Sequence, residues 1–243
     1  MSEPRGVVGL FSRLGVSLSP PKVIVLYGEP MVGKSVLSVM LAGRLASSMN
    51  RRVGLIYTEP VWEDPEYQSF VVNATNAKFD LVRLADWRHF NSIVAGFRDR
   101  VIVFDSISAL ITDIVSRFTM SGWDLRAVTP RVHQIVVTLV HYLRAVVNSS
   151  KTVAVIVAHA SSTAGTGRYR GVTDSRPSFT RRVLHECDAE LELRIDPENK
   201  DVRVLTVVAN RINPFSDGKS VYFRFIKGDV EEVPEEGLKV KVV

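Results

Sequence analysis

The chain has 243 residues, 46% of them hydrophobic and 23% charged, which is the composition of a globular protein with room for one large α/β domain or two small ones. The lone Cys187 excludes an internal disulfide, and no N-terminal stretch has the order of a signal peptide. No apolar run reaches the length of about 20 residues that crosses a bilayer. We therefore expect a cytoplasmic protein without membrane contact. The net charge of +5 indicates a polyanionic partner only weakly.

The first segment, residues 1–21, contains Gly, Ser and Pro with a short apolar cluster around Leu10, Phe11 and Leu14. We interpret it as an N-terminal arm without a core of its own. One α/β domain is expected over residues 22–243.

A phosphate-binding motif follows the arm. The apolar run Val23–Tyr27 predicts a strand, and apolar residues at helical spacing between residues 36 and 49 predict a helix. The segment between them, GEPMVGKS, fits the pattern GxxxxGK[ST], in which Lys reaches the β- and γ-phosphates and Ser holds Mg²⁺. The alternative is a glycine-rich turn that binds nothing. The predicted nucleotide contacts are Gly28, Glu29, Pro30, Met31, Val32, Gly33, Lys34, Ser35 and Val36.

Strand and helix patterns then alternate. Strands are predicted at residues 53–57, 81–84, 101–105 and 153–158, a helix at 87–97 after the N-cap Asp86, and a long helix capped by Thr129-Pro130. Residues 60–66 are expected to form a loop. Carboxylates end two of the strands, Glu59 after the second and Asp105 in a Walker B pattern, and His159 follows the last. This order predicts an α/β fold with a mainly parallel sheet.

The character of the sequence changes at residues 160–182, which carry five Arg against one Asp, a net charge of +4. Arginines interleaved with aromatic residues suit single-stranded nucleic acid, through backbone charge and base stacking. The alternative is a solvated basic loop. Residues 113–126 could add a second, weaker contact surface. The predicted DNA-binding residues are Arg168, Tyr169, Arg170, Arg176, Arg181 and Arg182.

Three strand-like runs at residues 189–195, 202–209 and 221–226 close the chain, with the turn signals Asp196-Pro197 and Asp217-Gly218 between them. They predict an antiparallel extension of the sheet.

The spacing of these motifs is similar to that of a known family. Glu59 lies 25 residues after Lys34 (59 − 34), Asp105 lies 71 after it (105 − 34), and the run Asp105-Ser106-Ile107-Ser108-Ala109-Leu110 has the form DSxxxL. Over residues 22–233 the chain resembles the RecA/RadA recombinase superfamily, especially the short archaeal RadB-like paralogues that consist of the ATPase core alone. The resemblance implies a three-layer RecA-like P-loop NTPase core.

The resemblance also implies roles for individual residues. Asp105 would hold the Mg²⁺ from its second shell beside Ser35. Glu59 would orient the attacking water, with Glu63, Asp64 and Glu66 as alternatives, or Glu59 would only cap the following turn. Tyr67 would stack on adenine or simply pack on the core.

Two further positions complete the implied catalytic set of Lys34, Glu59, His159 and Arg211. His159 stands where the family usually has the Gln or Asn that senses the γ-phosphate; the alternative is a strand-end histidine without that role. Arg211 would reach a neighbouring subunit's γ-phosphate, or it is an exposed loop arginine. His133 and His141 are too isolated for a metal site.

We therefore expect a slow, DNA-dependent ATPase that uses ATP and Mg²⁺, binds single-stranded DNA and assists recombination or repair. A full-length recombinase is a further candidate partner, and the oligomeric state is open. The alternatives are a KaiC-like signalling ATPase with a protein partner and a nucleotide-binding accessory protein that does not hydrolyse ATP.

Overall fold

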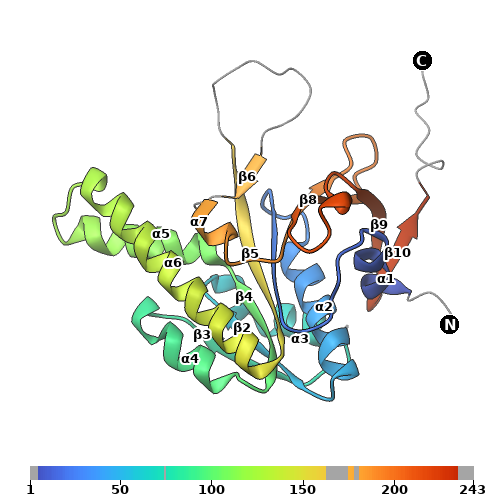
Figure 1. The fold of residues 1–243 in the computed structure, drawn as a ribbon, viewed down its shortest axis with the longest axis horizontal. Helices are drawn as coiled ribbons and strands as arrows, with labels where there is room; N and C mark the ends of the chain where they lie inside the picture. The colour runs from blue at the N-terminus through green and yellow to red at the C-terminus, as the bar shows by residue number, and fades with distance from the viewer. Residues whose placement is uncertain (1–4, 74, 163–174, 178–180, 235–243) are drawn as a thin grey trace.

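The computed structural model describes residues 5–73, 75–162, 175–177 and 181–234. Its strands form one sheet (Figure 1). In chain order they are β1 (Lys22–Gly28), β2 (Arg52–Tyr57), β3 (Phe79–Arg83), β4 (Arg100–Asp105), β5 (Val153–Ser162), β6 (Ser175–Pro177), β7 (Ala189–Ile195), β8 (Arg203–Asn210), β9 (Ser220–Ile226) and β10 (Asp229–Val233). The order across the sheet is β10-β9-β8-β7-β1-β5-β4-β2-β3, with β6 paired to β5 alone.

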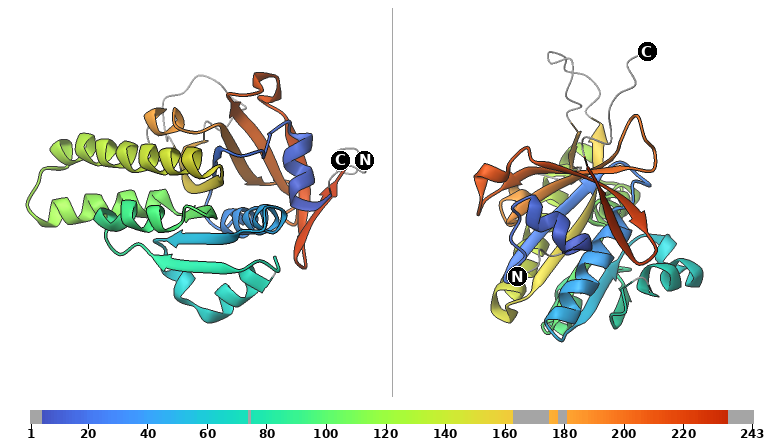
Figure 2. Two further views of the ribbon diagram at one scale, coloured as in Figure 1. Left: turned by 60° about the horizontal axis from the view of Figure 1, so that its bottom comes forward. Right: turned by 90° about the vertical axis from the view of Figure 1, so that its right-hand side faces the viewer.

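Helices cover both faces of this sheet (Figure 2). They are α1 (Gly6–Arg13), α2 (Lys34–Ser48), α3 (Pro65–Asn73), α4 (Phe90–Gly96), α5 (Ile107–Met120), α6 (Leu125–Ser150) and α7 (Arg181–Leu184), with the short 3-10 helices η1 (Pro60–Glu63), η2 (Trp87–His89) and η3 (Pro214–Ser216). One core forms where α1, α2 and α3 meet the sheet, and a second forms under α4, α5 and α6 on the other face. The predicted three-layer α/β architecture is confirmed.

The direction of the strands decides where the polar residues gather. Strands β1 to β5 and β7 run parallel, whereas β7, β8, β9 and β10 pair antiparallel in succession, as the sequence predicts. Gly28 is in register with His159, and Tyr57 with Asp105. The phosphate-binding loop, Glu59, Asp105 and His159 therefore lie along one edge of the sheet.

Three segments differ from the sequence-based expectation. The expected loop at residues 60–66 contains η1 and the start of α3, where the Asp64 side chain accepts the Glu66 N–H. The long helix begins at Leu125, because Asp124 caps it by accepting the Arg126 N–H, and Pro130 lies inside it. Residues 107–120 form α5, a helix that the sequence analysis did not include. The described helices contain no segment long and apolar enough to cross a membrane.

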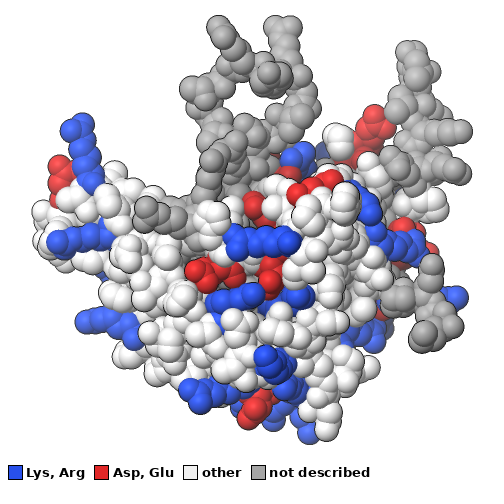
Figure 3. Space-filling view, viewed as in Figure 1, with Lys and Arg blue, Asp and Glu red and all other residues white. Residues whose placement is uncertain are grey.

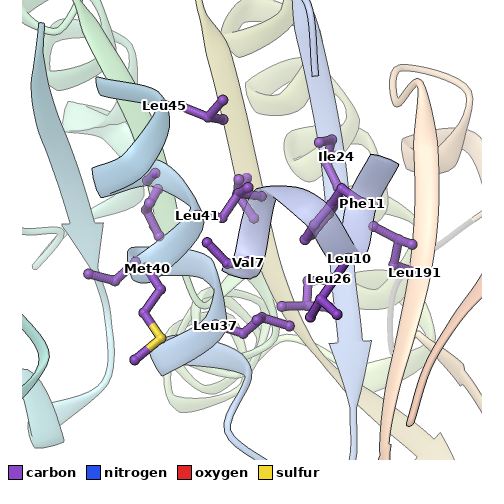
Figure 4. Close-up of a cluster of buried hydrophobic side chains, with 14 of the residues drawn as sticks. Val7, Leu10, Phe11, Ile24, Leu26, Leu37, Met40, Leu41, Leu45 and Leu191 are labelled. Carbon is purple, nitrogen blue, oxygen red and sulfur yellow. The ribbon is translucent and has the colours of Figure 1, made fainter. Parts of the chain in front are cut away.

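The N-terminal arm folds back on the domain. Helix α1 lies beside β10 and α2, and Leu10, Phe11 and Leu14 are each at most 2% exposed (Figure 4). They pack in the same core as Leu26 of β1 and Leu37 of α2. These three residues therefore contribute to the core of their own chain.

Candidate nucleotide site

The loop Gly28–Ser35 joins the end of β1 to the start of α2, so its backbone lies at a helix N-terminus, where anions bind. Gly33 has a φ of 100°, which side-chain-bearing residues rarely adopt, and a Cβ there would lie 2.5 Å from the Phe225 ring. A Cβ at Gly28 would lie 2.1 Å from the carbonyl oxygen of Leu193. Both positions thus need glycine, as the motif predicts.

Lys34 begins α2 and turns its side chain back over the loop. Its Nζ donates a hydrogen bond to the Glu29 carbonyl oxygen at 2.6 Å, and the residue is only 5% exposed. Burial lowers the pKa of Lys34, while the carboxylates of Asp105, Glu59 and Glu29 oppose that shift. Because an ammonium has three donors, Nζ can keep this bond and still bind phosphate oxygens.

Asp105 ends β4, and its carboxylate is buried beside Ser35 and Trp62. Burial raises the pKa of Asp105 to about 6, although hydrogen bonds with Ser35 and Trp62 oppose the increase. Trp62 Nε1 donates to Oδ2 at 2.8 Å. The other oxygen, Oδ1, has no hydrogen-bond partner among the described residues. One carboxylate oxygen is therefore fixed by the indole, and the other remains available.

These oxygens fit a magnesium ion. The Ser35 hydroxyl and the unpartnered Oδ1 of Asp105 are hard oxygen groups, which Mg²⁺ prefers. In the described part of the chain, no three His, Cys, Asp or Glu side chains gather to hold a metal alone. A Mg²⁺ here would therefore depend on phosphate oxygens and water for its remaining ligands.

Glu59 lies just beyond β2, and its Oε1 has two partners. Ser106 Oγ donates to it at 2.7 Å, and His159 Nε2 lies 2.9 Å away. The hydrogen bond with His159 is the main cause that lowers the pKa of Glu59, so the carboxylate is ionised at neutral pH. An ionised carboxylate close enough to Lys34 to influence its pKa can orient a water and accept its proton.

The other acids of this segment have different surroundings. Glu63 forms an ion pair with Arg83 at 2.6 Å. Asp64 caps the start of α3 through the N–H of Glu66. The structure therefore brings Glu59, rather than Glu63 or Asp64, into contact with His159 at the edge that carries the loop.

A pocket of about 760 Å³ opens beside the loop, between α2, α3 and the β9–β10 hairpin. Gly33 and Val36 line it on one side, Phe70 on another, and Arg203 and Phe225 on a third. The Arg203 guanidinium lies 6.0 Å from the centre of the Phe225 ring, and Phe70 is 66% exposed. The pocket thus offers two aromatic rings next to a phosphate-binding loop.

Tyr67 lies outside this pocket. Its hydroxyl is hydrogen-bonded to Ser35, and its ring meets Trp62 edge-on at 5.0 Å between centroids. Burial raises its pKa to about 12. The predicted stacking of Tyr67 on adenine is untested, but these contacts are those of the alternative, in which the ring packs on the core.

The remaining predicted residues lie farther along the chain. Arg211 follows β8, and its guanidinium binds the carbonyl oxygen and the Nδ1 of His185. Its predicted contact with a neighbouring subunit stays a prediction. In residues 113–126, Trp123 packs edge-on against Phe118 and under the Arg131 guanidinium.

The predicted DNA-binding residues lie mostly beyond what the structure describes. Arg168, Tyr169 and Arg170 lie outside the described residues. For the other three only the backbone is placed, Arg176 in β6 and Arg181 and Arg182 in α7. Strand β6 pairs antiparallel with β5, so this segment leaves the same edge as His159.

The geometry agrees with one solved structure in particular. The crystal structure of the RadB recombinase superposes with a TM-score of 0.57 at 19% sequence identity, covering 93% of this chain and 96% of that one. The chain has a RecA/RadA-like recombinase fold. Comparison of the sequence with protein-family models and with curated proteins finds no match. The fold expected from the motifs is therefore confirmed, while the function remains to be argued from the site.

Three residues of the candidate nucleotide site are not predicted from the sequence. Trp62, Ser106 and Phe70 touch the Walker B carboxylate, Glu59 and the pocket, respectively. A signal for Phe70 exists, because it lies three residues after Tyr67 in α3, close to one helical turn. Trp62 has no comparable signal, since its contact with Asp105 depends on the turn of η1.

Proposed function

We propose that this chain is a recombinase-like protein that binds ATP with Mg²⁺, hydrolyses it slowly and engages single-stranded DNA in recombination or repair. We place this activity in the cytoplasm. The observation that carries the proposal is the gathering of Lys34, Glu59 and Asp105 around a loop whose two glycines are sterically required. Proteins catalyse phosphoryl transfer mainly by positioning the reacting groups and by stabilising the negative charge of the transition state.

Each of these residues has a separate part in the reaction. The Lys34 ammonium would neutralise the β- and γ-phosphates, and Ser35 with Asp105 would hold a Mg²⁺, which would offset the negative charge of the phosphates. Glu59 would hold the attacking water, while Ser106 and His159 fix its carboxylate. The base of the nucleotide would lie in the pocket beside Gly33, against Phe70 and Phe225.

The DNA contact rests on charge and position. The segment 160–182 carries a net charge of +4 and begins within β5, directly after His159, a partner of Glu59. A change in the position of Glu59, or in the presence of a γ-phosphate, could therefore alter the position of His159 and, with it, the start of this segment. Arginine and aromatic residues together favour single strands, because every base has a face that can stack.

A second function is favoured by one contact. The Oε1 atom of Glu59 is occupied by both Ser106 and His159. If nucleotide binding leaves these bonds in place, the protein would hold ATP without turnover and act as an accessory to another recombinase. A KaiC-like ATPase with a protein partner remains the third alternative.

Nucleotide affinity and ATP turnover, each with and without single-stranded DNA, test the proposal. Lys34→Ala should abolish tight ATP binding, since it removes a ground-state contact. Glu59→Gln should keep binding and slow hydrolysis by about 10²-fold or more. The matched control Glu63→Gln, which changes the acid paired with Arg83, should turn over like the unchanged protein.

The outcomes separate the candidates. Tight ATP binding without turnover in the unchanged protein would favour the accessory role. An ATP turnover rate that is the same with and without DNA, together with no DNA binding, would favour the signalling ATPase. Normal turnover in Glu59→Gln would remove the role assigned to Glu59.

A further inference from the structure

The edge of the sheet opposite the nucleotide site is strongly basic. Parallel strands β1 to β5 all begin there, and the residues at or just before the first positions of these five strands carry seven cations and two acids, Asp80 and Asp99. Strand β7, which begins beside β1 after Glu186 and Asp188, bounds this edge on one side. Outside this edge the chain has 24 basic and 24 acidic residues, since it has 31 and 26 in total. We call the seven cations the basic edge: Lys22, Arg51, Arg52, Lys78, Arg98, Arg100 and Lys151.

The strand register places these cations in a line. Arg52 is directly opposite Arg100, and Lys78 is at the same level, because the next residues, Val53 and Phe79, are partners. Lys22 begins β1 one residue beyond this level, since it is the partner of Val153, and Ala154 is the partner of Ile102. Since neighbouring strands lie about 4.8 Å apart, the five strands β1, β5, β4, β2 and β3 span about 19 Å. Figure 3 shows blue side chains along the lower margin of the molecule, with few red ones.

Three of these cations, Arg51, Arg52 and Arg100, form hydrogen bonds or ion pairs within the chain. Arg51 donates to the carbonyl oxygens of Ser150 and Lys151 at 3.1 Å, where α6 ends. Arg100 donates to the Gly96 carbonyl oxygen at the end of α4, and Asp80 pairs with both Arg52 and Arg100. Cations near helix C-termini also offset the helix dipole.

Four cations remain without such a role. Lys22, Lys78, Arg98 and Lys151 have no side-chain partner among the described residues, and all except the half-buried Lys22 are exposed. Part of the positive charge of the basic edge is therefore not balanced by side-chain partners among the described residues. A line of unpaired cations fits a linear polyanion better than a single small anion.

The lack of exposed large hydrophobic side chains at the basic edge indicates which kind of polyanion it would bind. The exposed large hydrophobic residues of the described chain lie elsewhere, among them Phe70, Trp123 and Phe215. Single-strand binding uses aromatic stacking, and membrane-surface binding uses apolar side chains that enter the lipid. A surface with an excess of cations and without exposed large hydrophobic side chains suits the backbone of a duplex, whose bases stay paired and whose contacts go to phosphates.

We propose that the basic edge binds the phosphate backbone of a nucleic acid duplex. Successive phosphates of one strand rise about 3.4 Å, so a line of about 19 Å faces roughly five of them. The strand β5, Val153–Ser162, separates this edge from the Arg-rich segment by about 30 Å. The molecule would thus hold a duplex at one edge and a single strand at the other.

Fluorescence anisotropy with a labelled DNA duplex of about 30 base pairs, without nucleotide, tests this across about 50 to 200 mM salt. The edge variant combines Lys78→Gln, Arg98→Gln and Lys151→Asn, the last because Asn tolerates the φ of 49° at that position. A matched control, Lys200→Gln with Lys219→Gln and Arg224→Gln, removes the same charge from exposed positions around β8 and β9. Thermal melting verifies that both variants fold.

The edge variant should lose about tenfold or more in duplex affinity, and its salt slope should flatten by about 2.7 if each residue makes one contact. The control should keep both. Arg168→Ala with Arg170→Ala should flatten the slope for single strands by about 1.4 and leave the duplex slope unchanged. The duplex assay needs no ATP, so it can succeed even where the proposed ATPase fails.

Three results would overturn the proposal. The edge variant could bind the duplex like the unchanged protein. The control could lose as much affinity, which would mean that only net charge matters. The unchanged protein could ignore the duplex and bind phosphatidylserine vesicles or polyglutamate instead, which would assign the edge to a membrane or an acidic protein.

Discussion

Asp105 occupies surroundings that disfavour its charge. Burial raises the pKa of this carboxyl from 3.8 to about 6, so the folded chain holds a proton that the unfolded chain has lost between these pH values. The free energy of unfolding should therefore fall as pH rises from about 4 to about 6, by roughly 3 kcal/mol from this group. Glu59, whose pKa is lowered, acts in the opposite direction, because its contribution is lost as pH falls.

We therefore predict that Asp105→Asn stabilises the protein at pH 7.5 without Mg²⁺ or nucleotide, by up to about 3 kcal/mol, while it abolishes Mg²⁺-dependent ATP binding. The gain should shrink toward pH 4. Urea unfolding in a chelator at both pH values measures it. The control Asp113→Asn, at an exposed ion pair with Arg117, should change stability by less than about 1 kcal/mol at either pH. A variant less stable than the unchanged protein at pH 7.5 would contradict this.

Phe70, rather than Tyr67, should contact the base. Phe70→Ala is expected to weaken ATP binding about tenfold or more, because an aromatic stack on a base contributes about 1 to 3 kcal/mol. Tyr67→Phe keeps the ring against Trp62 and should leave the affinity within about twofold. Calorimetry with ATP and with tripolyphosphate measures both effects. Equal losses for the two ligands in Phe70→Ala would exclude a base contact.

For individual residues, the sequence could predict the roles of those that belong to a recognisable motif. Gly33, Lys34 and Asp105 lie where the phosphate loop and the buried strand put them. Trp62 could not be assigned, because its role depends on how η1 sits against β4, and its spacing from Tyr67 makes Phe70 a candidate only once the orientation of α3 is known. Phe70 faces the pocket and Tyr67 faces Ser35, a distinction that needs the orientation of α3.

Among the helices and strands, α1 gives a direct test of packing, because its apolar residues are buried in the core of their own chain. Phe11 is 1% exposed in the core of its own chain. We predict that Phe11→Ala lowers the free energy of unfolding by about 3 to 5 kcal/mol, the usual loss for a buried phenylalanine. Urea unfolding at several protein concentrations measures it.

The control for this prediction is Phe215→Ala. Phe215 is 91% exposed, so its replacement should change stability by less than about 0.5 kcal/mol. A loss in Phe11→Ala that shrinks as the protein is diluted would show instead that Phe11 binds a neighbouring molecule, because dilution would separate the molecules of the unchanged protein.

The elements that sequence patterns predicted best are the buried strands. The run Val101–Asp105 lies within β4, because a strand covered on both faces needs an unbroken apolar sequence. Helix starts were harder to predict. Thr129-Pro130 has the form of a cap, but Asp124 caps the helix earlier, and Pro130 lies inside α6, where it cannot donate a backbone hydrogen bond. The sequence predicts a loop at Asp64-Pro65, but α3 begins at Pro65.

For the whole molecule, we predict that the packing of α1 limits assembly. The resemblance to the recombinases implies a linker motif, Phe-x-x-Ala, that inserts into a pocket of the next subunit. Phe11-Ser12-Arg13-Leu14 has the phenylalanine of this motif but ends in leucine, and Phe11 and Leu14 are both buried within the chain. Filling a pocket made for alanine with leucine would cost about 1 to 3 kcal/mol. The protein should therefore not build long filaments alone, and any oligomer would form through Arg211 and a bound nucleotide.

Light scattering and electron microscopy with ATP and single-stranded DNA test this expectation. Scattering should stay at the level of small species, and addition of a full-length recombinase should be needed for longer assemblies. Regular filaments from the purified protein would refute it.

The N–H of Val7 bonds to Asp229, a partner 222 positions away, and Arg13 pairs with Glu232. Ribosomes add roughly 5 to 20 residues per second, so α1 leaves the exit tunnel roughly 10 to 40 seconds before β10 is made. During that time α2 and β1 can shelter part of its apolar face, but β10 cannot. A nascent chain that stalls before Asp229 would expose Val7, Leu10 and Phe11 together, and such incomplete products should be the species that chaperones and proteases bind first.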